Sequence, residues 1–224
     1  MFSFIRYKFA NITGVSLITV IATMTWYTAY EQFSASLYAN AISTSLNTIN
    51  DMNSSQHHDA LSNANVLAQQ LIDSKPSSAH HYELIHLLQQ WNNFSLGVGA
   101  VIESNWLLEQ STQRRPTWPI TYVEKAKILI LEKSPHKEIE QQIDLAAKYG
   151  PVHPKVQLMQ IKYGFERWES LLPQSRAALA IQLLKFNKNY RHKSQLNHMI
   201  QYSPAAQRMC NLFKFNNIQV TSCQ

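Results

Sequence analysis

Glycine is scarce in this chain, with five residues among 224. Barrels and sandwiches built from many tight turns need glycine far more often. A phosphate-binding loop is also excluded, because Gly97 and Gly99 have no third glycine and no following Lys-Ser or Lys-Thr pair. Apolar residues still make up 45% of the chain, which is enough for a core. The composition therefore indicates an all-α protein and argues against nucleotide enzymes.

Motifs for hydrolytic or zinc chemistry are missing as well. The chain contains neither Gly-x-Ser-x-Gly nor His-Glu-x-x-His. His81 and His86 are five positions apart, so they lie about 140° apart around a helix and cannot bind zinc as an i,i+4 pair does. The adjacent pair His57-His58 has the same weakness. We expect no metal and no cofactor.

The main paired carboxylates that suggest acid–base chemistry are Glu166 and Glu169. We expect them three positions apart on one helix, next to Lys162 and Arg167, which is typical of surface charges. A glycosidase would need two carboxylates projecting into one cleft. We therefore expect no catalytic residue.

Charge is absent from Phe9 to Tyr30, a run of 22 residues. As a helix the run would extend roughly 33 Å, slightly more than the hydrocarbon core of a membrane. Its six Ser and Thr hydroxyls can bond to carbonyls of their own helix, which makes them tolerable in lipid. Trp26 and Tyr27 lie close to Tyr30 at one end, as interfacial aromatic residues do. The sequence predicts a transmembrane anchor over residues 9–30.

The flanking charges predict the orientation of this anchor. Arg6 and Lys8 precede it, and the next basic residue is Lys75. The positive-inside rule then predicts a single-pass inner-membrane protein with a cytoplasmic N-terminus and a periplasmic body after about residue 31. Two alternatives remain, a buried helix and a cleaved signal peptide with small residues at 39–41. The apolar run is longer than the roughly 7–15 residues of a usual signal peptide.

Cysteine is nearly absent, with only Cys210 and Cys223. Their spacing fits no zinc pattern. In an oxidising compartment the two could form a disulfide that closes a small terminal loop. The alternative is one buried thiol and one free thiol in the tail.

Charge is unevenly distributed along the chain. Residues 1–110 carry three basic and seven acidic residues, a net charge of −4, and residues 111–224 carry 17 and seven, a net charge of +10. The basic half could contact an anionic glycan weakly, a lipid headgroup or an acidic partner. Nucleic acid is not expected outside the cytoplasm. Because the lysines are spread along the helices, a solvated face is the simpler interpretation.

Helical spacing of apolar residues continues after the anchor. Residues 31–52 form a stripe that predicts a stalk, and a break is expected at 51–56. Three further stripes precede residue 110. The stripes consist of Tyr38, Ile42, Leu46, Ile49 and Met52; Ala60, Ala64, Leu67, Ala68 and Leu71; Leu84, Ile85, Leu88 and Trp91; and Val101, Leu107 and Leu108. We expect residues 1–30 to form the cytoplasmic tip and anchor, 31–110 the stalk and first hairpins, and 111–224 a helical domain with a C-terminal tail.

Prolines punctuate the second half. We expect helices to start near Pro119, Pro154 and Pro173, after a Ser134 cap, and at Ser203-Pro204. Gly150 is expected to end one helix in a left-handed conformation. Pro119 and Pro154 are 35 residues apart, near the roughly 34-residue period of tetratricopeptide (TPR) repeats. The pattern predicts TPR-like antiparallel hairpins stacked into a small solenoid or bundle.

An irregular segment precedes these hairpins and is the predicted interaction surface. It contains Arg114, Arg115 and Trp118, and loops between helices often carry function. Arg115 and Trp118 could stack on a sugar ring. Tryptophan in a helical hairpin is more often a core residue, and Trp168 shares that alternative.

Three stretches of the second half together resemble a known family. They are Arg115-Pro116-Thr117-Trp118-Pro119, residues 143–157 with Gly150-Pro151 and Pro154, and then Trp168, Arg176 and Cys210. Over residues 114–210 the chain resembles the VpsP-type polysaccharide biosynthesis family. It departs from that pattern at Val152-His153, where an aromatic-acidic pair is commoner. The resemblance implies an N-terminal anchor, a TPR-like body and a role in exopolysaccharide production and export, and it implies no catalytic residues.

The sequence thus predicts a membrane-anchored periplasmic scaffold or regulatory protein of exopolysaccharide biosynthesis or export. It would act by protein–protein binding to other polysaccharide assembly proteins and would not be an enzyme. One alternative is a periplasmic sensor or pilus-type assembly module, which would dimerise through a regular heptad stalk at 31–52. The stripe there is short and rich in Ser and Asn. A glycan-modifying enzyme is the other alternative.

Overall fold

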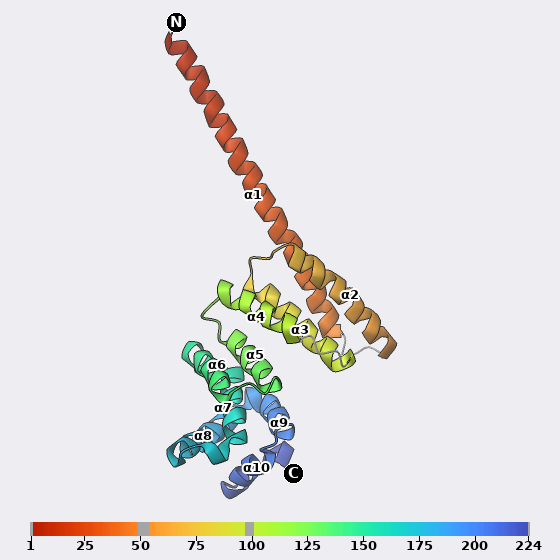
Figure 1. Cartoon of the computed structure of the whole chain (residues 1–224), viewed down its shortest axis with the longest axis vertical. Helices are drawn as coiled ribbons and strands as arrows, with labels where there is room; N and C mark the ends of the chain where they lie inside the picture. The colour runs from red at the N-terminus through yellow and green to blue at the C-terminus, as the bar shows by residue number, and fades with distance from the viewer. Residues whose placement is uncertain (1, 49–53, 97–100, 224) are drawn as a thin grey trace. The chain divides into compact units, whose positions relative to one another are not determined.

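The computed structural model describes residues 2–48, 54–96 and 101–223, and its side chains over 16–48, 59–93 and 104–223 (Figure 1). Throughout these ranges the regular structure is helical, and they contain no strand. The expected all-α class is therefore confirmed. The chain divides into two compact units, unit 1 from Met1 to Arg115 and unit 2 from Pro116 to Gln224.

The residues that the structure describes in unit 1 form four helices. They are α1 (Phe2–Thr48), α2 (Ser54–Asp73), α3 (Ala79–Leu96) and α4 (Val101–Arg114). The C-terminal part of α1 packs on α2 and α3, and α3 packs on α4. Within the described residues, no helix combines the length and the apolar character needed to cross a membrane.

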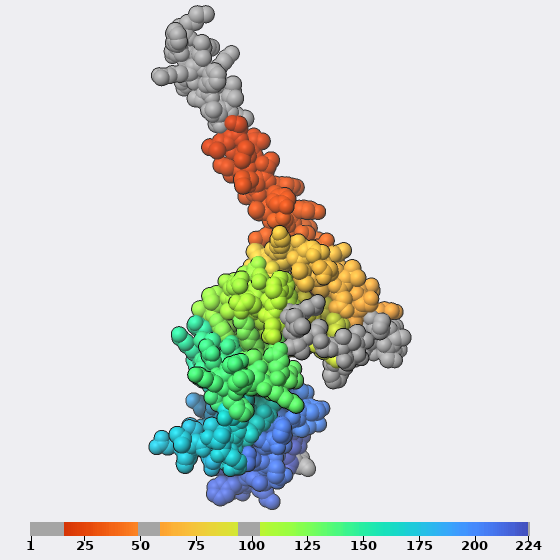
Figure 2. All heavy atoms as spheres, viewed as in Figure 1, coloured from red at the N-terminus to blue at the C-terminus, as the bar shows by residue number. Residues whose placement is uncertain are grey.

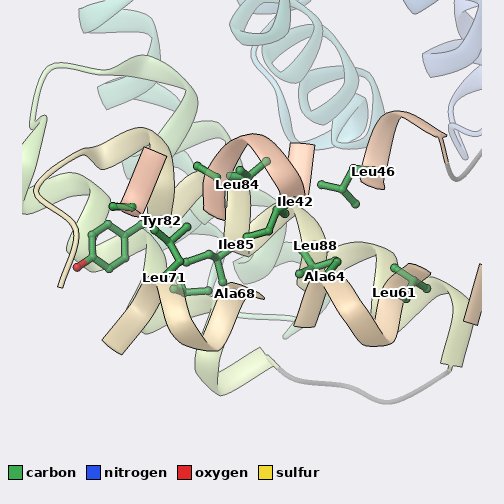
Figure 3. Packing of buried hydrophobic residues seen from close by; sticks show 13 residues of the cluster. Ile42, Leu46, Leu61, Ala64, Ala68, Leu71, Tyr82, Leu84, Ile85 and Leu88 are labelled. Carbon is green, nitrogen blue, oxygen red and sulfur yellow. The ribbon is translucent and has the colours of Figure 1, made fainter. Parts of the chain in front are cut away.

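The segment predicted as a stalk belongs to the packed core of unit 1. Ala35, Ala39, Ile42 and Leu46 are spaced four, three and four residues apart, so they share one face of α1, and all four are buried. Figure 3 shows Ile42 and Leu46 among the apolar side chains of α2 and α3. Residues 31–48 therefore form a bundle helix rather than a free stalk. Ile49 and Met52 lie outside the described residues, as do residues 51–53 of the predicted break at 51–56, whereas residues 54–56 already belong to α2 (Ser54–Asp73).

The other predicted stripes of unit 1 form its core. Those of α2 and α3 meet the buried face of α1, and Leu107 of α4 joins them. Leu108 is also buried. The side chain of Val101 lies outside the described residues.

Unit 2 consists of six helices in the described part of the chain. They are α5 (Pro119–Leu131), α6 (His136–Tyr149), α7 (Pro154–Glu166), α8 (Pro173–Asn187), α9 (Lys193–Gln201) and α10 (Ala206–Phe215). Proline stands at the first position of α5, α7 and α8, as expected, because its missing N–H costs nothing there. Short 3₁₀ turns lie at Trp168–Ser170, Tyr190–His192 and Thr221–Cys223.

Successive helices of unit 2 pack as hairpins. Helix α5 packs on α6, and α7 packs on α8 as well as on both helices of the first hairpin. Helix α9 packs on α7 and on α10. One apolar core lies between α5, α6 and α7, and a second extends from α7 through α10 to Val220. Helix α7 contacts both α5 and α9, and it therefore joins these three helices.

The predicted serine cap of α6 is wrong. Helix α5 ends at Leu131 and is followed by Lys133 at φ 56°, and the N–H groups of Lys133 and Ser134 donate to the carbonyls of Ile130 and Leu129 at 3.1 and 2.9 Å. This is a Schellman motif with lysine in the left-handed position. The backbone of Ser134 therefore completes α5, and Pro135 precedes α6 without any side-chain cap.

The predicted left-handed glycine is also wrong. Gly150 has φ −148° and ψ 61°, which a left-handed helix end does not use. A Cβ at Gly150 would instead lie 2.6 Å from Cγ of Pro119. Glycine is required here because the end of α6 touches the first residue of α5.

The last hairpin differs from the expectation at both helices. Helix α9 has no initiating proline and was not predicted. Helix α10 begins at Ala206, two residues after the expected start at Pro204. Ser203 is buried, and its hydroxyl accepts from the N–H of Ala205 and lies 3.2 Å from Oε1 of Glu166.

Candidate functional site

A groove on the surface of unit 2 is lined by both apolar and lysine side chains. It has a volume of about 690 Å³ and is lined by α5, α7 and α9 and by Tyr202. Because α7 packs on both α5 and α9, the exposed faces of these three helices lie next to one another. The lining comprises Val123, Lys127, Ile130, Leu131, Lys155, Leu158, Met159, Lys162, Ser194, Gln195, His198, Met199 and Tyr202.

The groove has an apolar floor and an apolar rim. Val123 and Met159 are buried beneath it. Leu131 and Tyr202 stand at its edge with 76% and 67% of their surface exposed. Large exposed apolar side chains that gather around a concavity mark binding surfaces rather than stability.

The charges of the groove have a single sign. Lys127, Lys155 and Lys162 line it, and no Asp or Glu does. Lys127 forms an ion pair with Glu124 at 2.8 Å. Lys155 and Lys162 form no ion pair with any residue that the structure describes. Two ammonium groups are therefore available to a negatively charged ligand.

The groove is not predictable from any single helix. Taken one helix at a time, the lysines form a solvated face. The available signal was the placement of lysine beside apolar residues on the same helix face, as with Val123, Lys127 and Leu131. Only the packing of three helices places these faces on one surface.

The predicted interaction residues fall into different units. Arg114 donates to the carbonyls of Pro76 and Gln110 at 3.1 Å each, and its guanidinium carbon lies 4.5 Å from the centre of the Tyr82 ring. It therefore links the end of α4 to the segment before α3. Arg115 is exposed and ends unit 1, whereas Trp118 belongs to unit 2. The indole of Trp118 is half-buried and contacts the ring of His153 edge-on at 6.3 Å.

The two carboxylates considered for catalysis serve structural contacts. Helix α7 ends at Glu166, so Glu169 lies in the following 3₁₀ turn and not on the same helix. Glu166 contacts the Ser203 hydroxyl, and Glu169 pairs with Arg208 at 2.6 Å.

Two arginines, one from α8 and one from α10, contact this turn. The guanidinium carbons of Arg176 and Arg208 lie 5.9 and 5.7 Å from the centre of the Trp168 ring. Their nitrogens also donate to backbone carbonyls of Trp168, Glu169 and Phe165 at 2.9 to 3.1 Å. Trp168 is thus part of the packing between α7, α8 and α10, as the core interpretation expects.

Cys210 and Cys223 form a disulfide with a Cα–Cα distance of 5.4 Å. The bridge holds the C-terminal turn against α10. Ser222 adds hydrogen bonds from its N–H and hydroxyl to Oδ1 of Asn197 in α9, at 3.4 and 3.2 Å. A second, mostly polar hollow of about 770 Å³ lies beside the disulfide, with Lys214 as its one charged lining residue among those described.

The histidines form no metal centre among the described residues, where no three His, Cys, Asp or Glu side chains gather. Burial lowers the pKa of His81 below its ordinary value of 6.5. Burial also lowers the pKa of His153, and the charges of Lys155 and His192 lower it further. Both rings are therefore mainly neutral near pH 7. The side chains of His57 and His58 lie outside the described residues.

No protein-family model, no curated protein and no solved structure matches this chain. The resemblance to the VpsP-type family stays a prediction.

Proposed function

We propose that this protein is a membrane-anchored scaffold that binds an acidic, partly apolar segment of a partner protein in the groove of unit 2. Binding is its whole activity in this proposal. The observation that carries it is the groove lined by α5, α7 and α9, which combines an apolar floor, two lysines without ion pairs and no acidic side chain. In this view α5–α6 and α7–α8 act as TPR-like hairpins, offset by 35 residues from Pro119 to Pro154.

The chemistry of the groove favours a protein segment over a small ligand. It is open and edged by Leu131 and Tyr202, which suits apolar side chains of an extended or helical segment. Carboxylates on that segment would pair with Lys155 and Lys162, and this complementarity selects the partner more than it adds affinity. Residues 151–224 carry ten basic and two acidic residues, so the surroundings also attract an acidic partner.

The anchor at residues 9–30 is part of the proposal, and two observations support it. The apolar side chains of residues 17–30 are exposed on all sides of α1. On the face drawn in Figure 2, no other described part of the chain covers this segment, which is the upper part of the red region. An apolar surface on every side of a helix suits lipid better than water. In addition, the hydroxyls of Thr23 and Thr28 donate to carbonyls of their own helix at 2.9 to 3.1 Å, so they need no water.

The proposed compartment is the periplasm. The disulfide supports it, because structural disulfides persist in oxidising compartments. A fusion after residue 50 to a reporter that is active only outside the cytoplasm should be active. Activity of a cytoplasm-specific reporter at the same position would contradict this topology.

The pathway assigned by the proposal is exopolysaccharide assembly, and it rests on the resemblance of residues 114–210. Deletion of the gene should change the amount or the chain length of surface polysaccharide. Unchanged amount and chain length would remove this pathway and leave the groove proposal standing.

Binding in the groove can be measured directly. The full chain in detergent micelles would be titrated into a fluorescently labelled amphipathic peptide rich in Glu, with a Lys-rich peptide of the same apolar pattern as a reference. We expect micromolar binding of the acidic peptide, at least tenfold weaker binding by the double variant Lys155→Glu/Lys162→Glu, and none of the basic peptide.

The matched control places the same charge change on another helix. Lys185 and Lys188 are exposed at the end of α8 and do not line the groove. Lys185→Glu/Lys188→Glu should bind the acidic peptide within about twofold of the unmodified protein. Equal losses in both double variants would show that net charge alone attracts the peptide, and the groove would not be its site.

A further inference from the structure

Helix α1 carries a second apolar face that none of the described helices covers. Its buried face consists of Ala35, Ala39, Ile42 and Leu46 and contacts α2 and α3. At 100° per residue, the opposite side of the helix, about 180° away, carries Trp26, Tyr30, Phe33 and Leu37. All four of these side chains are exposed, including Phe33 at 63% and Leu37 at 52%.

The exposed face follows a heptad pattern. Its positions are alternately four and three residues apart over Thr19, Thr23, Trp26, Tyr30, Phe33 and Leu37, and we call these six residues the α1 seam. Alternation of four and three is the spacing of a helix that pairs with another helix in a left-handed supercoil. The next seam positions, Asn40, Thr44 and Asn47, are polar, so the seam ends at Leu37.

Lipid does not account for the outer end of the seam. The proposed span ends at Tyr30, and Glu31 follows it. Leu37 lies seven residues farther on, about 10 Å along the helix axis, whereas the headgroup layer is roughly 5–7 Å thick. Leu37 would therefore stand in water unless a protein surface covers it.

We propose that a second copy of this chain covers the seam, so that two α1 helices pair in parallel. The proposal rests on the proposed anchor in one respect, because two anchored copies share one orientation and one depth in the membrane. Identical residues then meet at each seam position, with threonine pairs at its inner end and aromatic or aliphatic pairs from Trp26 to Leu37. The positions beside the seam outside the membrane, Ser34 and Ser36, are small and uncharged, so they add neither bulk nor like-charge repulsion.

The inner end of the seam suits close helix contact within lipid. Thr19 and Thr23 form a pair of small residues four positions apart, which lets two helix backbones approach. The hydroxyl of Thr23 donates to the carbonyls of Thr19 and Val20 at 3.0 and 2.9 Å, so it needs no hydrogen-bond partner on the second helix.

Pairing of two chains also provides two grooves per assembly, and a partner with two acidic segments would bind with higher avidity.

Cysteine cross-linking of the full chain in native membranes tests the pairing. Phe33→Cys and Leu37→Cys place a thiol on the seam, and Thr28→Cys and Gln32→Cys place one at exposed positions off the seam. Mild oxidation should give a cross-linked dimer at least fivefold more abundant for the two seam variants. Equal yields at all four positions, or no dimer at any, would overturn the proposal that a second copy of this chain covers the seam.

A second measurement tests the pairing of α1 independently of peptide binding in the groove. Light scattering of the full chain in detergent should give a dimer, and Phe33→Glu/Leu37→Glu should give a monomer. The control Val66→Glu adds a charge at an exposed apolar position of α2 and should stay dimeric. The monomeric variant should still bind the acidic peptide, so a failure of pairing and a failure of the groove are distinguishable.

Discussion

At the scale of single residues, two glycines of unit 2 lie where another element approaches the backbone closely, and they should respond differently to alanine. A Cβ at Gly150 would meet the Pro119 ring at 2.6 and 2.8 Å, and one at Gly164 would meet the methyl groups of Leu179 at 2.7 and 3.0 Å. The proline ring is fixed at the start of α5 and cannot rotate away, whereas the tips of a leucine can.

Gly150→Ala should therefore destabilise the protein by about 1–3 kcal/mol, the usual cost of overpacking. Gly164→Ala should be close to neutral, because alanine regains up to about 1 kcal/mol of helix propensity inside α7. Chemical denaturation of both variants gives the comparison. An equal loss in the two would show that the Pro119 contact is as easily relieved as the Leu179 contact.

Lys133 stands in a left-handed position that favours glycine. A φ of 56° costs an L-residue about 1–2 kcal/mol, and glycine avoids this cost. Glycine also makes the unfolded chain more flexible, which offsets part of the stabilisation. Lys133→Gly should raise the free energy of unfolding by about 0.5–1 kcal/mol. Lys137→Gly, at the second residue of α6, should lower it by up to about 1 kcal/mol. A loss of stability in both variants would mean that the Lys133 side chain contributes contacts of its own.

His153 should make stability depend on pH. Its pKa in the folded protein is below the ordinary 6.5, first because of burial and then because of Lys155 and His192. As pH falls below about 6.5, the unfolded chain gains a proton at this residue that the folded chain does not accept, so stability is lost with falling pH. Unfolding free energies measured from pH 7.5 to 5.5 should fall less steeply for His153→Gln, and parallel slopes would exclude this contribution.

At the scale of helices, proline and apolar spacing made most of the architecture of this chain predictable. Pro119, Pro154 and Pro173 correctly marked three helix starts, because each occupies a position whose N–H has no partner. Helix α9 was missed because it has no proline and only Leu196 and Ile200 of its side chains are buried. Two such residues are too few for a periodic signal.

Contacts between helices do not follow from local sequence patterns. Glycine is required at position 150 because of a close contact with Pro119, 31 positions away. The groove is likewise formed by residues from three helices, α5, α7 and α9. The buried face of residues 31–48 was recognised as a stripe, but its partners α2 and α3 were not, and so a stalk was predicted. Local patterns indicate which face of a helix is apolar, and they do not indicate what covers it.

The disulfide constrains the last element of unit 2. Cys210 and Cys223 are 13 residues apart, and closing a loop of this size removes entropy from the unfolded chain worth about 3 kcal/mol. Cys210→Ala/Cys223→Ala should therefore lower the midpoint of thermal unfolding, and it should abolish any effect of reductant on that midpoint. A midpoint of the unmodified protein that reductant does not change would show that the bridge contributes nothing to stability.

At the scale of the whole chain, the two units differ in charge as well as in core. Unit 1 carries five basic and seven acidic residues, a net charge of −2, and unit 2 carries 15 and seven, a net charge of +8. The described core clusters follow the same division, because one is built from α1 to α4 and the other two from α5 to α10 and the C-terminal turn. The surface that would attract an acidic partner and the helix that carries the seam therefore belong to separate cores.

Because no described core cluster spans both units, a cavity in one core should loosen that unit alone. Leu88 in α3 and Leu183 in α8 are fully buried, and truncating either to alanine should cost about 2–5 kcal/mol. Hydrogen-exchange mass spectrometry on the full chain should show faster exchange only in peptides from residues 1–115 for Leu88→Ala. For Leu183→Ala, the faster exchange should be confined to peptides from residues 116–223. Faster exchange throughout the chain in either variant would show that the units unfold together, and binding in the groove would then depend on the stability of unit 1.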